Sequence, residues 1–483
     1  MKIIISYPPL TGRGSPMLTQ NRQFQWYHSP SYIYPLTMAM GATLLKKEGF
    51  EVVWNDCIAE KLDYSEFLDS IQNNLPALIA FETKTPVIKQ HWRIINHLKK
   101  EYGDSLKIAL IGDHVTALPE ESFKNSCVDF IIRGGNYDLL LLNIARHMRD
   151  KAELEAGIWY REGDTIRNCG DFSLVQDLNQ LPFIDRSLTK ASLYGEKWKR
   201  YIPFFYVQAG RDCHWHRCTF CSWTTLYPEF VRRSPTHLLD EIDMLVHEYH
   251  VKEIFDDTGT FPHGDWLDEF CEGMIERGLS KKILFSCNMR FGSINDKQIT
   301  LMKRAGFRKL KMGMESAVQK TLDRLKKGVI AEKIPAECKI ISSHGLDIHL
   351  TVMIGYPWES RSDIMKTLDC ANNLMKNGYI EMLQATTAVP YPGTKLYEQA
   401  KEDDWFRIDP SDYEKYDMSE PILKTPGIEP EEITAYCQKL YRCFLTPGFI
   451  IRNITKVRSL NDLHYIYRGA KAVIGHIRDY AHG

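Results

Sequence analysis

The chain alternates short apolar, β-rich runs with helical patterns over most of its length, and this alternation limits the folds open to it. Up to about residue 150 the runs are apolar and closely spaced, as in a parallel sheet covered by helices on both faces. The expected strands are Lys2–Ser6, Glu51–Asn55, Ala77–Phe81, Lys107–Gly112 and Val128–Arg133. The expected helices are Thr37–Glu48, Tyr64–Asn73, Lys89–Glu101, Pro119–Asn125 and Asp138–Arg149. We therefore predict a doubly wound, Rossmann-like α/β domain over residues 1–150.

A second alternating series follows a polar stretch. Residues 151–198, in which glycines and prolines interrupt polar residues, predict a linker between domains that contains a short hairpin. Six more expected strands are Pro203–Gln208, Glu253–Asp256, Ile283–Cys287, Lys309–Gly313, Ile348–Ile354 and Met382–Ala388. Helical stretches separate them, which predicts a partial or complete TIM-like α/β barrel over residues 199–410. Residues 411–483 are expected to be mostly helical.

Charge and hydropathy narrow the classes of function. The chain has 61 Lys and Arg against 62 Asp and Glu, so it has no overall field that would attract nucleic acid. We find neither the roughly 20 apolar residues that a membrane span needs nor a signal peptide, and we expect a cytoplasmic protein. The segment Ile450–Tyr480 mixes apolar with basic residues. A solvated helix packed on the barrel is the simpler interpretation, and peripheral membrane contact is the alternative.

Three of the 12 cysteines, Cys213, Cys218 and Cys221, lie within nine residues of one another, directly after a strand of the expected barrel. Thiolates are the usual ligands of iron in Fe-S clusters, and barrel chemistry sits at the carboxyl ends of the strands. Three ligands would leave one iron of a [4Fe-4S] cluster open to a substrate. Structural zinc bound with His214 or His216 is the alternative.

Polar or glycine-bearing sequences follow the other barrel strands as well. They are DDTGTF, NMRFG, GMES, GYPWES and PYPGT, and together with RDCHWHRCTFC they recur in the order of the strands. This recurrence predicts one site assembled from several strand ends.

On these motifs the chain resembles radical S-adenosylmethionine (radical SAM) enzymes with an N-terminal cobalamin-binding domain. CTFCSW, GMES, MIGYPWES and AVPYPGTKLYE carry the resemblance, and the tail YRCFLTPGFIIRNI is similar to the branch of hopanoid-biosynthesis and anaerobic magnesium-protoporphyrin cyclase enzymes. The resemblance implies that the three cysteines hold a [4Fe-4S] cluster whose open iron binds S-adenosylmethionine. It also implies S-adenosylmethionine contacts from Phe220, Asp257, Thr258, Gly259, Arg290, Glu315, Ser316 and Gly355. The chain departs from the family in one respect, because four residues separate Cys213 from Cys218 where three are usual.

The resemblance further implies that the N-terminal domain holds cobalamin. GDHVTALPEE is similar to the segment after the fourth strand in these enzymes, whereas Gly134, Gly135 and Asn136 depart from the usual glycine-acid sequence. The implied cobalamin contacts are Thr83, Gly112, Asp113, His114, Thr116, Gly134 and Gly135. No DxHxxG motif provides a histidine below cobalt, and His114 is more simply a hydrogen-bonding residue than a cobalt ligand.

As a radical SAM enzyme, the chain would cleave S-adenosylmethionine reductively to a 5′-deoxyadenosyl radical and functionalise an unactivated carbon. We predict C-methyl transfer. The alternatives are radical cyclisation or rearrangement of a tetrapyrrole, hopanoid or other lipid-like substrate, and a zinc- or cobalamin-binding regulatory protein without catalysis. The expected partners are a small-molecule substrate of hydrophobic character and an electron donor such as ferredoxin or flavodoxin.

Overall fold

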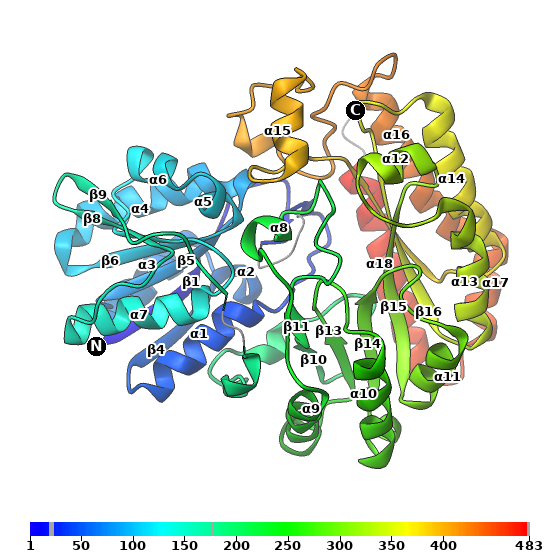
Figure 1. Cartoon of the computed structure of the whole chain (residues 1–483), viewed down its shortest axis with the longest axis horizontal. Coiled ribbons are helices and arrows are strands. Elements are labelled where there is room, and N and C mark those ends of the chain that lie inside the picture. Colours follow the sequence, from blue (N-terminus) through cyan, green and yellow to red (C-terminus); the bar gives the residue numbers. More distant parts are fainter. Residues whose placement is uncertain (19–23, 175–176, 481–483) are drawn as a thin grey trace.

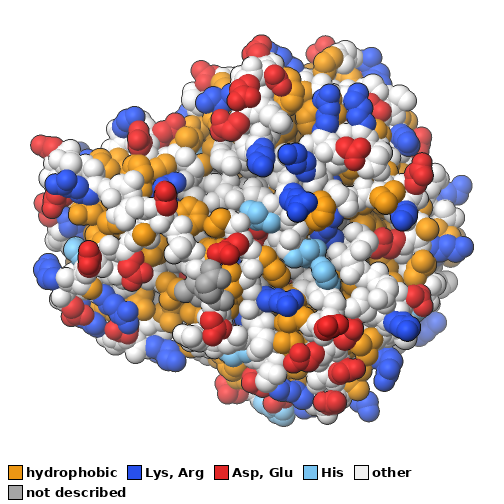
Figure 2. All heavy atoms as spheres, in the orientation of Figure 1, with side chains coloured by type: hydrophobic (Ala, Val, Ile, Leu, Met, Phe, Trp, Pro, Cys, Tyr) orange, Lys and Arg blue, Asp and Glu red, His pale blue; other side chains and the backbone are white. Residues whose placement is uncertain are grey.

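The computed structural model describes residues 1–18, 24–174 and 177–480. Residues 175–176 of the predicted linker and residues 481–483 of the predicted helical segment lie outside the described residues. Two large sheets stand beside each other, each with helices packed against it (Figure 1). Figure 2 shows acidic and basic side chains interspersed over one face, in keeping with the balanced charge.

The first sheet has the strand order β4-β1-β5-β6-β7-β8-β9. Its parallel strands are β1 (Lys2–Tyr7), β4 (Glu51–Asp56), β5 (Leu78–Thr83), β6 (Lys107–Gly112) and β7 (Phe130–Ile132). Every residue of β5 is buried, as expected of a strand covered on both faces. The expected helices are also present, as α1 (Leu36–Lys47), α3 (Tyr64–Asn74), α4 (Ile88–Tyr102), α6 (Pro119–Asn125) and α7 (Tyr137–Asp150). Two short helices add to them, α2 (Cys57–Glu60) and α5 (Asp113–Ala117).

The first sheet continues past residue 150, which corrects the prediction that residues 151–198 only link two domains. The predicted hairpin is there, as β8 (Ile158–Glu162) and β9 (Thr165–Asn168), but it pairs antiparallel with β7 and extends the sheet. The edge of β7 would otherwise present unpaired backbone groups, which the hairpin satisfies.

The second sheet has six parallel strands in sequential order. They are β10 (Phe204–Val207), β13 (Glu253–Asp256), β14 (Leu284–Met289), β15 (Phe307–Glu315), β16 (Asp347–Ile354) and β17 (Met382–Thr387). Among the described residues β10 and β17 do not pair with each other, so the barrel is open. The longer helices between or after these strands are α9 (Pro235–Tyr249), α10 (Asp265–Glu276), α11 (Asp296–Arg304), α13 (Ile334–Ser343), α14 (Arg361–Lys376) and α15 (Lys395–Glu402).

The C-terminal segment is helical, as predicted, with α16 (Pro430–Tyr441), α17 (Pro447–Thr455) and α18 (Leu460–Asp479). The last helix touches both sides of the opening in the barrel. Arg468 donates a hydrogen bond to the carbonyl of Lys199, just before β10, at 2.8 Å. Tyr480, at the end of α18, donates to the carbonyl of Ala385 in β17 at 2.7 Å. The helix therefore lies across the gap between β10 and β17. No helix in the described part of the chain is both long and apolar enough to cross a lipid bilayer.

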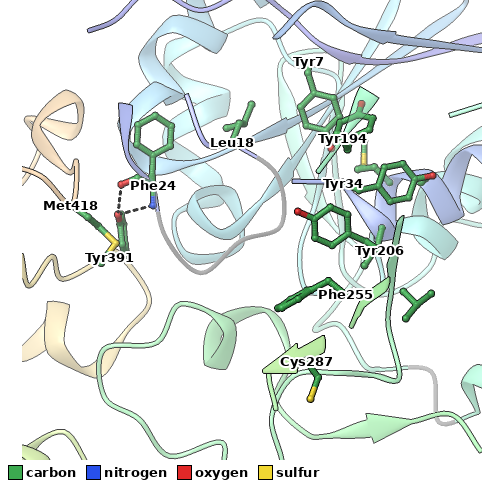
Figure 3. Packing of buried hydrophobic residues seen from close by; sticks show 14 of the residues in the cluster. Tyr7, Leu18, Phe24, Tyr34, Tyr194, Tyr206, Phe255, Cys287, Tyr391 and Met418 are labelled. Atoms are coloured by element: carbon green, nitrogen blue, oxygen red, sulfur yellow. Dashed lines mark hydrogen bonds between the residues drawn. The ribbon is translucent and has the colours of Figure 1, made fainter. Parts of the chain in front are cut away.

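The two sheets meet at loops that follow their strands. Arg211, just after β10, reaches Asp138 at the start of α7, with one guanidinium–carboxylate distance of 3.2 Å. The N–H of Gly135 donates to the carbonyl of Leu226 at 2.8 Å. Figure 3 shows Tyr391 turned toward Phe24, whose N–H donates to the tyrosine hydroxyl at 3.2 Å. Because ligands bind beyond the carboxyl ends of parallel strands, the interface brings the two expected binding edges together.

Candidate active site

The three clustered cysteines line one cavity at the carboxyl ends of the barrel strands. Their loop connects β11 (Gly210–Arg211) to the short helix α8 (Trp223–Leu226). The thiol of Cys213 lies 3.0 Å from the hydroxyl of Thr260 in the loop after β13. Apolar and aromatic side chains line the same cavity, among them Met353, Val389, Tyr391 and Met418. The cavity thus combines three thiols with apolar surface.

Positive side chains stand beside the thiols. Burial raises the pKa of Cys218, and the charges of Lys327 and Arg290 oppose that rise. Burial also disfavours the charge of Lys327, but Glu315 and the Cys218 thiol raise the pKa of this ammonium. These cations would stabilise thiolates, which are the form of cysteine that binds iron.

The four residues between Cys213 and Cys218, which we call the bulge, are fixed to another loop through Trp215. The indole of Trp215 donates a hydrogen bond to the carbonyl of Lys326 at 2.7 Å, and its ring packs against Gly328. The guanidinium of Arg290 lies 4.2 Å from the centre of the same ring, in a cation–π contact. Trp215 therefore anchors the cysteine loop on residues 326–328.

The two histidines of the bulge have other partners. His216 Nδ1 is paired with the carboxylate of Asp212, and the rings of His214 and His263 meet edge to face at 4.2 Å. Throughout residues 1–18, 24–174 and 177–480, no three His, Cys, Asp or Glu side chains are placed to hold one metal ion. In a four-iron cluster each thiolate binds a separate iron, so its ligands need not converge on one point. The donor set of three thiols around an open cavity fits such a cluster.

Glu315 has a backbone conformation that non-glycine residues rarely adopt, with φ of 60°. Its carboxylate accepts hydrogen bonds from Lys327 Nζ at 2.8 Å and from the Thr351 hydroxyl at 3.4 Å. Strain of this kind persists where surrounding contacts hold a functional side chain in place. Here those contacts orient a carboxylate toward the cavity that the cysteines line.

The structure places five of the predicted S-adenosylmethionine contacts on this cavity: Phe220, Asp257, Gly259, Arg290 and Glu315. The amide of Asn288 also lines the cavity, as do the hydroxyls of Thr224, Thr260 and Thr351. This mixture fits a ligand that carries an amine, a carboxylate, a ribose and an aromatic base. The nitrogens of Arg290, however, donate to the carbonyls of Lys327 and Gly328, at 2.7 and 3.3 Å. Arg290 thus supports the bulge at the same time as it lines the cavity.

The other three predicted contacts are not among the residues that line the cavity. The hydroxyl of Thr258 accepts a hydrogen bond from the N–H of Gly210 at 3.0 Å. Ser316 is buried and lies 3.2 Å from the hydroxyl of Thr367. Gly355 donates its N–H to Glu359 at 3.0 Å. These residues build the loops around the site.

Lys327 and Thr260 are site residues that the sequence analysis did not identify. Thr260 belongs to DDTGTF, so the position after Gly259 was a detectable signal. Lys327 lies beyond the short helix α12 (Gln319–Arg324), away from any strand end, and no motif marks it.

Gly259 lies where the loop after β13 packs tightly against the cysteine loop. A Cβ atom here would lie 2.6 Å from the carbonyl oxygen of Asp212 and 3.1 Å from Cys213 Cβ. We expect Gly259→Ala to displace the loop, lower the iron bound after anaerobic reconstitution and cost about 1–3 kcal/mol of stability. Iron analysis and thermal unfolding measure the two effects. Gly448→Ala is the matched control, since its nearest neighbouring atom would be 3.9 Å away, and equal iron in both variants would contradict the steric argument.

The predicted cobalamin contacts gather at the ends of β5, β6 and β7. The Thr116 hydroxyl donates to the carbonyl of Gly112 at 2.7 Å and accepts from the N–H of Gly134 at 3.1 Å. Asp113 forms a buried ion pair with Lys84, and a Cβ on Gly112 would lie 2.1 Å from the carbonyl oxygen of Thr83.

The chain's own aromatic rings cover part of this edge. Phe172 packs directly on Gly134 and Tyr227 on Gly135. His114 is buried, lies 3.2 Å from the Thr85 hydroxyl and packs its ring edge to face against Tyr413.

Residues 207–371, which include the cysteine loop and the strands behind it, match the family model of the Radical SAM superfamily. The chain carries a radical SAM domain. This domain makes the protein an enzyme and implies a [4Fe-4S] cluster and S-adenosylmethionine as cofactors. The third possibility raised by the sequence, a regulatory protein without catalysis, is therefore set aside.

The radical SAM domain lies within a longer region of similarity to known proteins. The chain is 26% identical to an uncharacterized methyltransferase of Pyrococcus horikoshii, covering 87% of this chain and 90% of the relative. It is 24% identical to the anaerobic magnesium-protoporphyrin IX monomethyl ester cyclase of Rubrivivax gelatinosus, covering 87% and 76%.

Solved structures share the fold over nearly the whole chain. The radical SAM methyltransferase TsrM from Kitasatospora setae, with cobalamin and a [4Fe-4S] cluster bound, has a TM-score of 0.69 and 13% identity, and the similarity covers 99% of both chains. The cobalamin-dependent radical SAM enzyme OxsB, with aqua-cobalamin and S-adenosylmethionine bound, has a TM-score of 0.69 and 15% identity, covering 98% of this chain and 71% of that one. The α/β architecture with its parallel sheets is thus one found in radical SAM enzymes that bind cobalamin.

Proposed function

We propose that the protein is a cobalamin-dependent radical SAM enzyme that transfers a methyl group to an unactivated carbon of a small molecule. The observation that carries this proposal is the cavity that is lined both by Cys213, Cys218 and Cys221 and by apolar residues. Tyr391, which also lines this cavity, is hydrogen-bonded to Phe24 of the N-terminal part of the chain. A substrate in the cavity would lie between the cysteine loop and the neighbouring domain.

The chain's own residues define two halves of the site. When bound, the reduced cluster supplies the electron that cleaves S-adenosylmethionine, and methylcobalamin supplies a methyl group. Glu315 and Lys327, paired at 2.8 Å, offer a carboxylate and an ammonium to the polar end of S-adenosylmethionine. Met353, Val389 and Met418 give the cavity apolar surface that disfavours water and suits an apolar substrate.

Two features support cobalamin at the domain interface. A hydroxyl group and a glycine, Thr83 and Gly112, end the neighbouring strands β5 and β6, where doubly wound domains bind their ligands. The hydroxyl of Thr225 in α8 is buried and has no hydrogen-bond partner in the described part of the chain. A buried hydroxyl in this state favours an additional polar partner. The relatives named as methyltransferases and the cobalamin-bound neighbours in structure agree with this assignment.

Isotope transfer tests the proposal. The enzyme, reconstituted without oxygen with iron, sulfide and hydroxocobalamin, would be incubated with methyl-labelled S-adenosylmethionine, a reductant and fractionated extracts. We expect label in a product together with 5′-deoxyadenosine and S-adenosylhomocysteine, all measured by mass spectrometry. Deoxyadenosine with a changed but unlabelled product would instead support radical cyclisation or rearrangement, which the similarity to the magnesium-protoporphyrin cyclase favours.

A further inference from the structure

The helix α17 exposes apolar residues that an ordinary surface helix would bury. Its sequence, PGFIIRNIT, contains one phenylalanine and three isoleucines, yet none of its nine residues, all of them described, is buried. Ile451 and Ile454 are each 60% exposed, and Ile450 is 44% exposed. Side chains of this size normally lie in the core, so a group of them on one surface indicates contact with something other than water.

The next helix, α18, also exposes apolar residues, and its Ile474 lines the same cavity as Ile450 and Ile454 of α17. Leu460, Leu463, Tyr467 and Ile474 are 76%, 51%, 63% and 49% exposed. Their spacings of three, four and seven residues place them along one side of a helix. Other positions of α18, such as Ala472 and Val473, are buried against the protein. We call the exposed residues the α17–α18 face, which comprises Leu445, Ile450, Ile451, Ile454, Leu460, Leu463, Tyr467 and Ile474.

A largely apolar cavity opens between the two helices. Its volume is about 330 Å³, and its walls include Phe449, Ile450, Ile454, Ile466 and Ile474. The carboxylates that also line it are already paired with cations: Asp347 with Arg308, Glu381 with Lys456 and Asp462 with Arg200. The cavity thus offers space for hydrocarbon without an unpaired carboxylate in its walls.

The charged residues that α17, α18 and the residues next to them contribute are mainly basic. Residues 445–480, all described, contain six basic side chains: Arg452, Lys456, Arg458, Arg468, Lys471 and Arg478. The two acidic residues of this segment, Asp462 and Asp479, are both buried. Asp462 is paired with Arg200, and Asp479 is paired with His28 and His476. A face of this kind repels a second copy of itself and attracts a negatively charged surface.

We propose that the α17–α18 face binds the surface of an anionic lipid bilayer. The isoleucines and leucines would enter the boundary between headgroups and acyl chains, and the lysines and arginines would contact the phosphates. This attachment involves neither the cysteine loop nor the cavity beside it, so it holds whichever reaction the enzyme performs.

Vesicle sedimentation tests the proposal with the holoenzyme. We expect the protein to sediment with vesicles of phosphatidylcholine and phosphatidylglycerol, and to bind pure phosphatidylcholine vesicles much more weakly. The triple variant Ile451→Asp, Ile454→Asp, Leu463→Asp should lose at least about tenfold in affinity, because its apolar groups no longer enter the lipid. The control Ile330→Asp, Ile340→Asp changes isoleucines that are 51% and 42% exposed elsewhere, and it should bind like the wild type.

The charges are tested separately. Lys471→Gln with Arg478→Gln should weaken binding about 25-fold, or about fivefold for each charge removed, and salt should reduce the difference. Wild-type protein that stays in the supernatant with anionic vesicles would overturn the proposal, as would equal binding by the triple variant. Light scattering that shows a dimer abolished by the same aspartate substitutions would assign the face to a second copy of the chain, which also overturns it.

Discussion

Cys218→Ala is expected to abolish both cluster assembly and the formation of 5′-deoxyadenosine. Cys218 lines the cavity together with the other two cysteines of the loop, and the charges of Lys327 and Arg290 favour its thiolate. Without Cys218, one iron of the cluster loses its protein ligand. Among the described residues, the cavity has no fourth cysteine that could replace it. Iron and sulfide analysis after anaerobic reconstitution, the absorbance of the cluster and deoxyadenosine by chromatography should all fall to background.

Cys127→Ala and Cys57→Ala are the matched controls for this experiment. Cys127 is exposed and Cys57 is buried in the core of the N-terminal domain, so together they represent both environments of a cysteine outside the loop. Both variants should bind iron as the wild type does. A colourless wild-type protein that retains one zinc ion per chain would contradict the assignment of the loop to a cluster.

Arg211→Met is expected to destabilise the folded protein by about 3–5 kcal/mol, because it leaves the carboxylate of Asp138 buried without its partner. Burial disfavours the charge of Arg211, but Asp138 raises its pKa. Both side chains are almost wholly buried, and Asn136 accepts a further hydrogen bond from the same guanidinium. The pair joins the cysteine-loop side of the barrel to the first turn of α7, so its loss should also loosen the interface. Denaturant unfolding measures the free energy.

Two comparisons separate this effect from lost packing. The double variant Arg211→Met, Asp138→Leu should recover much of the stability, since apolar side chains often replace a buried ion pair without loss. Arg361→Met removes the exposed pair with Glu432 and should have a much smaller effect. A single variant as stable as the wild type would mean that water reaches Asp138.

The fold was predictable from the sequence because most strands of both sheets are parallel, contain several apolar residues and alternate with helical patterns. All eleven expected strands are present, with ends that differ by no more than two residues at either end, and β13 spans Glu253–Asp256 as expected. The sequence predicted the hairpin β8–β9 in the correct segment, but not that the hairpin joins the first sheet. Nothing in its alternation of residues tells which sheet edge it will join, since that depends on which edge lacks a partner.

The candidate site was predictable only where its residues are neighbours along the chain. Three cysteines within nine residues must lie close together, whereas Lys327 reaches them through the loop beyond α12 and leaves no local pattern. The motif DDTGTF predicted S-adenosylmethionine contacts from Asp257, Thr258 and Gly259 alike. Adjacent residues in a strand-end loop point in different directions, and Thr258 turns its hydroxyl to the backbone of Gly210.

The position of α18 across the opening between β10 and β17 sets an order of events during synthesis. Residues 460–479 leave the ribosome only after the cysteine loop and all six barrel strands have done so. Until then the outer edges of β10 and β17 lack this cover and can pair with other chains. A nascent chain that stalls before residue 460 is therefore a candidate for aggregation, and chaperones should recognise it.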